Sequence, residues 1–259
     1  GWNVLVACGL LQGYKQLRLR NRAPLPIDPR EIDAVILTHA HLDHSGYLPL
    51  LIKNGFAGKV YCSEATRDLC AILLPDSGHL QEEEAEYARR HKYSRHTSPL
   101  PLYTREDAER ALTRFTPVDF GRDVDLGGGL TLRFSPAGHM LGSSFVQLRH
   151  EGGTLLFTGD LGRPNDLIMV APTVISRADY LVVESTYGDR RHDPADPRQR
   201  LAEVINRTAK RGGAVIVPAF AVGRAQTLMY LISLLKAARA IPDLPVFLNS
   251  PMAVNATRI

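Results

Sequence analysis

The segment THAHLDHSG, residues 38–46, places His39, His41, Asp43 and His44 within six consecutive positions. Imidazole nitrogens and carboxylate oxygens are suitable zinc ligands, and a catalytic zinc site keeps one position open for water. A hydrogen-bonded surface loop could account for one or two of these histidines, but it does not account for the pattern H-x-H-x-D-H directly after an apolar run. The segment therefore predicts a metal site.

Three more candidate site residues follow apolar, strand-like runs elsewhere in the chain. They are His139 after residues 130–135, Asp160 after 154–158 and Glu184 after 180–183. In an α/β sheet the loops at the carboxyl ends of the strands build the site, so these side chains are expected to converge. Once His139 and Asp160 join the first segment, there are more donors than one ion needs, which predicts two ions that share a bridging carboxylate.

Short apolar runs and amphipathic stretches alternate along the chain and predict a mixed α/β fold. Strands are expected at residues 2–7, 34–38, 130–135, 154–158, 180–183 and 214–217, and helices at about 80–90, 105–112 and 224–240. Thr104 and Asp107 form a capping pair that opens the second helix. The polar segment 188–200 is the strongest candidate for a domain junction, followed by a new strand–turn–helix unit.

Composition sets broader limits on the class of protein. The 259 residues carry a formal net charge of +4, which is compatible with a polyanionic substrate but too small to argue for one. Three cysteines without metal-type spacing indicate free thiols in a reducing compartment. We expect a cytoplasmic protein that does not act in a membrane, since no apolar run is long enough to span one.

Three motifs resemble the metallo-β-lactamase fold: THAHLDHSG, PAGHMLGS and FTGDLGR, in that order. The resemblance implies an αββα sandwich that holds two metals at one edge. Further motifs resemble the β-CASP nucleases of this fold, prokaryotic relatives of the cleavage subunit of the mRNA 3′-end machinery; they are ESTYG (184–188), PAFAVGRAQ (218–226) and NSPMAVNAT (249–257). Residues 1–187 would then be the metallo-β-lactamase domain, and 188–259 the start of an inserted β-CASP α/β domain.

The resemblance also implies a role for each matching residue. One zinc ion would be bound by His39, His41 and His139, a second by Asp43 and His44, and Asp160 would bridge both. Asp43 and Glu184 would form the catalytic group, with Glu184 orienting or polarising a ligand. Gly223 and Arg224, at the start of a helix, suit a contact with RNA phosphate, although an ordinary strand–helix turn explains them equally well. Arg163 is a weaker candidate for the same role.

The implied activity is hydrolysis of single-stranded RNA by a hydroxide that two zinc ions activate, with endonucleolytic and 5′ to 3′ exonucleolytic cleavage both open. Two alternatives remain: a non-catalytic RNA-binding scaffold, and a hydrolase of small esters or thioesters. A homodimer is an open alternative to the monomer.

The sequence departs from the β-CASP pattern in three places. In the family, other strands come before the strand in which this sequence begins. The sequence also carries Ala7 where the family has an aspartate, and it ends inside the inserted domain. The absent aspartate usually supports the metal site from beneath, so Ala7 predicts an altered support.

Overall fold

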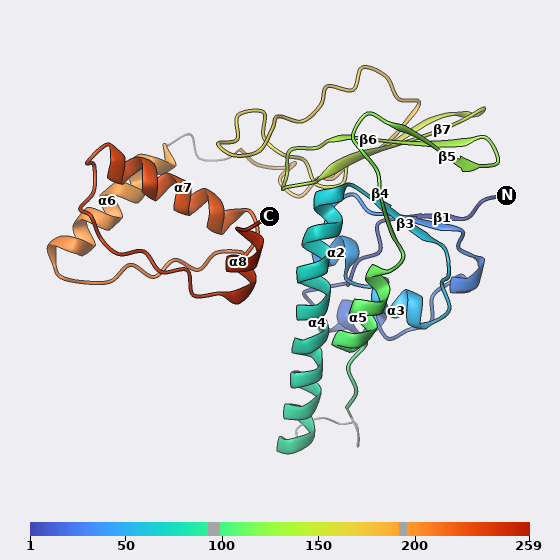
Figure 1. The fold of residues 1–259 in the computed structure, drawn as a ribbon, viewed down its shortest axis with the longest axis horizontal. Helices are drawn as coiled ribbons and strands as arrows, with labels where there is room; N and C mark the ends of the chain where they lie inside the picture. The colour runs from blue at the N-terminus through green and yellow to red at the C-terminus, as the bar shows by residue number, and fades with distance from the viewer. Residues whose placement is uncertain (93–98, 192–195) are drawn as a thin grey trace. The chain divides into compact units, whose positions relative to one another are not determined.

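The computed structural model describes residues 1–92, 99–191 and 196–259, which form two compact units, Gly1–Glu184 and Ser185–Ile259 (Figure 1). The first unit contains nearly all of the regular structure that surrounds the predicted ligands. Its elements are β1 (Val4–Val6), α1 (Lys15–Arg20), the 3-10 helix η1 (Pro29–Glu31), β2 (Ala34–Ile36), α2 (Leu42–Ser45), α3 (Leu48–Lys53), β3 (Lys59–Cys62), α4 (Glu64–His91), α5 (Arg105–Leu112), β4 (Phe115–Pro117), β5 (Asp123–Gly127), β6 (Leu130–Pro136), β7 (Ser144–His150), β8 (Gly153–Phe157) and β9 (Tyr180–Val182).

Two sheets form the centre of this unit. The first has the order β1-β2-β3-β4 with all strands parallel, and the second has the order β5-β6-β7-β8-β9 with only the β8–β9 pair parallel. Helices α3, α4 and α5 lie beside the first sheet, on the side away from the second (Figure 1). The predicted mixed α/β sandwich is therefore confirmed for this unit.

The main core lies between the two sheets. Strand β2 is buried at every position, as expected for a parallel strand covered on both faces. One apolar cluster joins residues of both sheets: Ala34, Ile36 and Tyr61 from the first, and Leu126, Leu132, Phe134, Val146 and Leu148 from the second. Burial of these side chains fixes the sheets against each other and thereby positions the loops at their ends.

Helix α4 is much longer than the sequence predicts, because it begins at Glu64 rather than near residue 80. Pro75 and Gly78 read as helix breakers, yet both lie inside it. At Gly78 a side chain would meet the backbone of Thr104 and Arg105, with a Cβ only 2.7 Å away, so the glycine allows α4 to touch the start of α5. The predicted capping box of α5 is present, with Thr104 and Asp107 bonded reciprocally.

The second unit is helical in the part that the structure describes, with α6 (Pro197–Lys210), α7 (Arg224–Ala237) and α8 (Pro251–Ala256). Ile205, Leu235 and Ile241 form its small core. The strand predicted at 214–217 is wrong: Ile216 is 90% exposed and no described strand pairs with this segment. An isolated strand leaves its backbone groups unpaired, so a short apolar run alone does not establish one. Of the predicted junction 188–200, residues 192–195 lie outside the described residues, and α6 already begins at Pro197.

Two smaller expectations can be compared with the structure. All three cysteines are free and buried. In the described ranges, no helix is both long and apolar enough to cross a bilayer.

Candidate metal centre

Three loops that are far apart in the sequence meet at one edge of the sandwich. The first follows β2 and carries His39, the second follows β6 and carries His139, and the third follows β8 and carries Asp160. Backbone hydrogen bonds join them: Ser144 N donates to Thr38 O at 2.8 Å, and Gly162 N donates to Ala137 O at 2.9 Å.

Glycines let these loops come close together. A Cβ on Gly162 would lie 2.0 Å from the carbonyl carbon of Gly138. Gly138 itself has φ +71°, a conformation that glycine adopts without strain. The loops that carry His139 and Asp160 therefore touch backbone to backbone.

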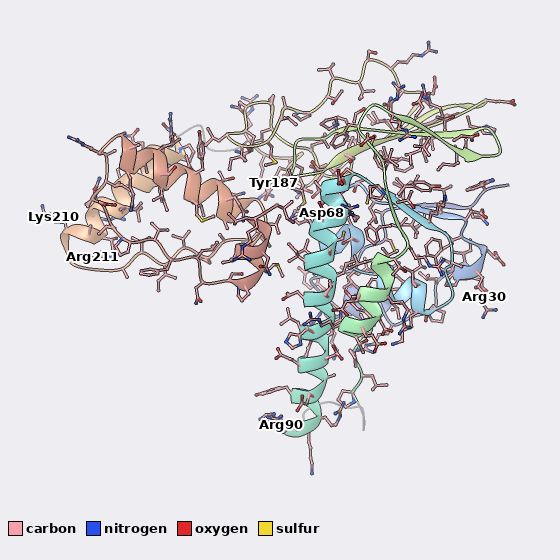
Figure 2. The ribbon with its side chains drawn as sticks, in the orientation of Figure 1. Arg30, Asp68, Arg90, Tyr187, Lys210 and Arg211 are labelled. Atoms are coloured by element: carbon pink, nitrogen blue, oxygen red, sulfur yellow. The ribbon has the colours of Figure 1, made fainter. Side chains whose placement is uncertain are left out.

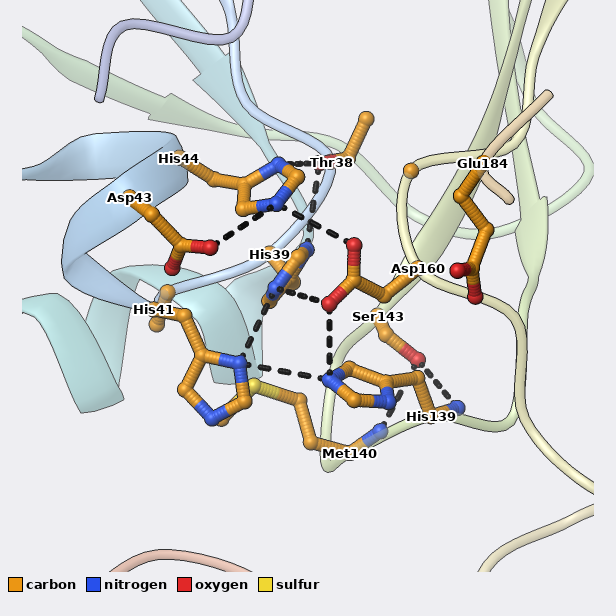
Figure 3. A network of polar contacts seen from close by, with 12 residues as sticks. Thr38, His39, His41, Asp43, His44, His139, Met140, Ser143, Asp160 and Glu184 are labelled. Atoms are coloured by element: carbon orange, nitrogen blue, oxygen red, sulfur yellow. Dashed lines mark hydrogen bonds and ion pairs between the residues drawn. The ribbon is translucent and has the colours of Figure 1, made fainter. Parts of the chain in front are cut away.

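Four of the predicted ligands converge on one point (Figure 3). His41 Nδ1 lies 3.1 Å from His39 Nε2 and 3.2 Å from His139 Nε2. Asp160 Oδ2 lies 3.4 Å from His139 Nε2 and 3.8 Å from His39 Nε2. All four donor atoms lie within 4.8 Å of one another.

These separations fit a tetrahedral metal ion. Zinc bonds to nitrogen and oxygen are about 2.0–2.1 Å long, which places neighbouring ligand atoms about 3.3–3.4 Å apart. The four measured separations, from 3.1 to 3.8 Å, span this value. The donor set therefore suits a metal ion.

A second group of donors lies on the other side of Asp160. His44 Nε2 is 3.1 Å from Asp160 Oδ1 and 3.6 Å from Asp43 Oδ2. The two oxygens of Asp160 thus face different histidines, Oδ1 toward His44 and Oδ2 toward His39 and His139. The Asp43 side chain is 56% exposed, so this second group is the more open of the two.

The protonation states suit metal binding. Burial lowers the pKa of His39 well below its ordinary value, and the neighbouring His44 and His41 lower it further. Burial is also the main cause of the lowered pKa values of His41 and His139. These three rings are therefore neutral at pH 7, with lone pairs available.

Asp160 and His44 shift each other's pKa through their short contact. The hydrogen bond from His44 holds the pKa of Asp160 at about 2. Burial lowers the pKa of His44, but the hydrogen bond and the charge of Asp160 outweigh it, and the net pKa of His44 is raised. Asp160 is therefore a carboxylate throughout the physiological range.

Two hydroxyl residues support the ligands, and the sequence had not assigned them a role. Thr38 Oγ1 lies 3.2 Å from His39 Nδ1 and 3.3 Å from His44 Nδ1. Ser143 Oγ accepts from the backbone N–H of His139 at 2.9 Å and of Met140 at 3.2 Å. Their positions inside THAHLDHSG and PAGHMLGS were the only signal available, since both contacts depend on how the loops fold.

The remaining predicted residues lie in different places. Glu184 follows β9, beside Asp160 (Figure 3), and its carboxylate accepts from Leu161 N at 2.8 Å. It thus holds the turn that carries Asp160. Arg163 is exposed on the same loop. Gly223 and Arg224 lie in the second unit, where Gly223, with φ +83°, precedes the first residue of α7.

The match to known proteins agrees with this geometry. Residues 3–204 match the family model of the metallo-beta-lactamase superfamily. The chain belongs to the metallo-beta-lactamase superfamily. The resemblance inferred from the three motifs is thereby confirmed, and the His/Asp cluster occupies the edge of the sandwich where the superfamily was expected to hold its metals.

Several relatives of this chain are named for roles in RNA cleavage or transcription termination. Ribonuclease TTHA0252 of Thermus thermophilus is 39% identical over 254 residues, covering 98% of this chain and 54% of that protein. Transcription termination factor FttA of Pyrococcus abyssi is 38% identical, covering 88% and 34%. FttA of a Lokiarchaeum species is 32% identical, covering 95% and 38%. The chain thus spans about half or less of the length of these relatives.

Proposed function

We propose that this chain is the metal-binding part of a ribonuclease that hydrolyses phosphodiester bonds of single-stranded RNA with two zinc ions. The observation that carries the proposal is the placement of Asp160, whose two oxygens face two separate histidine groups. The names of the relatives, a ribonuclease and transcription termination factors, support RNA as the substrate class.

Each ligand has a role in this proposal. His39, His41 and His139 would hold one zinc ion, Asp43 and His44 would hold the second, and Asp160 would contribute to both. Bound zinc supplies Lewis acidity, which lowers the pKa of water and stabilises charge that develops on a phosphodiester.

The residues of the chain hold and orient this site. Thr38 and Ser143 fix the histidine loops, and Glu184 holds the turn of Asp160 through Leu161 N. The carboxylate of Asp43 is placed to orient a water molecule or accept its proton, because it is exposed to solvent and lies 3.6 Å from His44 Nε2.

The second unit belongs to the proposal as the start of an inserted β-CASP domain, with residues 188–259 as its predicted extent. The exposed Arg224 at the first turn of α7 is a candidate phosphate contact there. The ESTYG motif and the named relatives support this assignment over a small-ester hydrolase, which needs no second unit.

The test uses the full-length protein that contains this chain. We expect about two zinc ions per chain by elemental analysis, and cleavage of end-labelled single-stranded RNA. His41→Ala is expected to abolish cleavage and lower the metal content. The matched control is His79→Ala, which removes an exposed histidine on α4 that pairs with Glu83.

Three outcomes would contradict the proposal. Equal cleavage by wild type and His41→Ala would show that the cluster is not the site. RNA binding without metal or cleavage would favour the non-catalytic scaffold. Faster turnover of simple thioesters than of RNA would favour the small-ester hydrolase.

A further inference from the structure

Residues 14–22, YKQLRLRNR, form an exposed basic segment built around helix α1. Lys15, Arg18, Arg20 and Arg22 are all exposed, and no residue of α1 is buried. No acidic residue occurs between Gly9 and Ile27. Four cations within eight positions therefore face solvent without an acidic neighbour along the sequence.

Three exposed arginines on helices α4 and α5 of the same unit pair with acidic residues of their own helix. Arg90 pairs with Glu86 at 2.7 Å, Arg105 with Glu109 at 2.9 Å and Arg110 with Glu106 at 3.2 Å, each pair at i,i+4 spacing. Arginines paired with acidic residues of the same helix in this way are typical of a solvent-exposed helix face.

The basic segment lacks these pairs. Within the described ranges, none of its four cations forms an ion pair with a carboxylate, and only Arg22 has a protein acceptor, Leu100 O at 2.8 Å. Like charges in close array repel one another, so this arrangement costs stability unless an anion is bound.

Hydrogen bonds connect the segment to the metal centre. Asn21, which is 7% exposed, donates to Leu11 O at 2.8 Å and accepts from Leu11 N at 2.9 Å. One residue earlier, Leu10 N donates to Leu42 O at 2.8 Å. Cys8 N donates to His44 O at 2.7 Å, so this loop runs along the turn that carries the ligands.

The segment also carries an aromatic side chain on which a nucleic-acid base can stack. Tyr14, directly before α1, is 82% exposed. Cations that follow a phosphate backbone, together with an aromatic surface for base stacking, are the two features of single-strand binding sites. An acidic protein surface would use the cations but has no base to stack on Tyr14.

We propose that the basic segment 14–22 is a contact surface for the RNA strand on its way to or from the metal centre. The inference rests on the proposed function, because it names a contact surface for that substrate. Lys15, Arg18 and Arg20 contact phosphates, and Tyr14 stacks on a base.

The test compares two triple variants of the full-length protein. One is Lys15→Gln, Arg18→Gln and Arg20→Gln. The control is Arg90→Gln, Arg105→Gln and Arg110→Gln, which removes the same charge from paired positions; Arg90 lies at the far end of α4 (Figure 2). Binding of a labelled single-stranded RNA is measured with chelator present, so that the RNA stays intact, over a range of salt concentrations.

Loss of three phosphate contacts is expected to make the slope of log K against log salt shallower by about 2. The ratio of the RNA affinity of wild type to that of the segment variant then falls roughly 20-fold as the salt concentration rises from about 50 to 200 mM. The control variant keeps the wild-type slope. With metal restored, hydrolysis of bis(4-nitrophenyl) phosphate, which is too small to reach the segment, is unchanged in both variants.

Three results would overturn the inference. The first is an equal slope change in both variants, which would reflect net charge alone. The second is an unchanged slope in the segment variant while wild type still cleaves RNA, which leaves the proposed function intact. The third is displacement of RNA by poly-L-glutamate at equal charge, which would favour an acidic protein. If wild type neither binds nor cleaves RNA, the proposed function fails together with the inference.

Discussion

Replacement of Thr38 by valine tests how the metal centre is organised. The Thr38 side chain is 2% exposed, and its oxygen lies within 3.3 Å of Nδ1 of both His39 and His44. Gly159 leaves room for it, because a Cβ there would lie 2.7 Å from Thr38 Cβ. Valine keeps the shape of the side chain and removes only the hydroxyl group.

The hydroxyl oxygen can accept two hydrogen bonds, one from each Nδ1–H. That arrangement leaves Nε2 of the neutral His39 bare and directed toward Asp160, ready to bind metal, whereas His44 donates from its Nε2 to Asp160 in the metal-free protein. Without the hydroxyl group, the His39 tautomer with the proton on Nε2 becomes favoured, since Asp160 can accept it. Metal binding then has to displace that proton.

We expect Thr38→Val to weaken zinc binding by about 10–100-fold, as is usual for the loss of an outer partner of a histidine ligand. This corresponds to about 1.4–2.7 kcal/mol. Zinc affinity is measured by competition with a chromophoric chelator, and the tautomers by long-range nitrogen–proton NMR of the metal-free protein. Thr38→Ser, which keeps the hydroxyl group, is expected to bind zinc like wild type.

Equal zinc affinity of Thr38→Val and wild type would refute this reasoning. So would a serine variant as weak as the valine variant, because the loss would then come from packing. Nδ1–H tautomers that persist in Thr38→Val would show that another group holds the rings.

Three further predictions concern stability. Ala7 has φ +63°, so Ala7→Gly is expected to raise the free energy of unfolding by about 0.5–1 kcal/mol, measured by urea denaturation. Asp107→Ala is expected to lower it at pH 7 by about 1–2 kcal/mol, because the capping box of α5 and an ion pair are lost. Gly162→Ala is expected to lower it by about 1–3 kcal/mol and to weaken metal binding, because the new Cβ would overlap Gly138. Gly152→Ala, with nothing within 4 Å of its Cβ, is the control.

The effect of Asp107 depends on pH in a defined direction. Burial raises its pKa, but the hydrogen bond and charge of Lys53 and the bonds from Thr104 outweigh burial, and the net pKa is lowered. A carboxylate with a depressed folded pKa stabilises the protein above the unfolded value of about 3.9. That contribution is lost as pH falls through the folded pKa. The stability gap between wild type and Asp107→Ala should therefore shrink from neutral pH toward about pH 3; a constant gap would contradict the assignment.

Local patterns predict the parts of the fold that depend on neighbouring residues. The apolar run 34–38 identifies β2, and Thr104 with Asp107 identifies the start of α5. The spacing of His39, His41, Asp43 and His44 alone predicts a metal site in that segment. In each case the physical cause lies within a few residues.

The features that the sequence did not show depend on contacts between distant segments. Gly78 lies inside α4 because the start of α5 needs that space, and residues 214–217 are not a strand because none of the described strands pairs with them. The position of Thr38 Oγ1 beside two histidines depends on how its own loop folds. The position of Asp160 between two donor groups follows from loops about a hundred residues apart along the chain. Local periodicity contains no information on such distances.

Because three loops meet at the candidate metal centre, insertions and deletions are tolerated at some positions of the chain and not at others. Insertions between the loops, such as near the far end of α4, leave every ligand in place because surface connections absorb added residues at small entropic expense. A single residue inserted between His39 and His44 would instead turn at least one donor away from Asp160. Related chains should therefore differ freely in the distances that separate these loops and agree residue for residue within them.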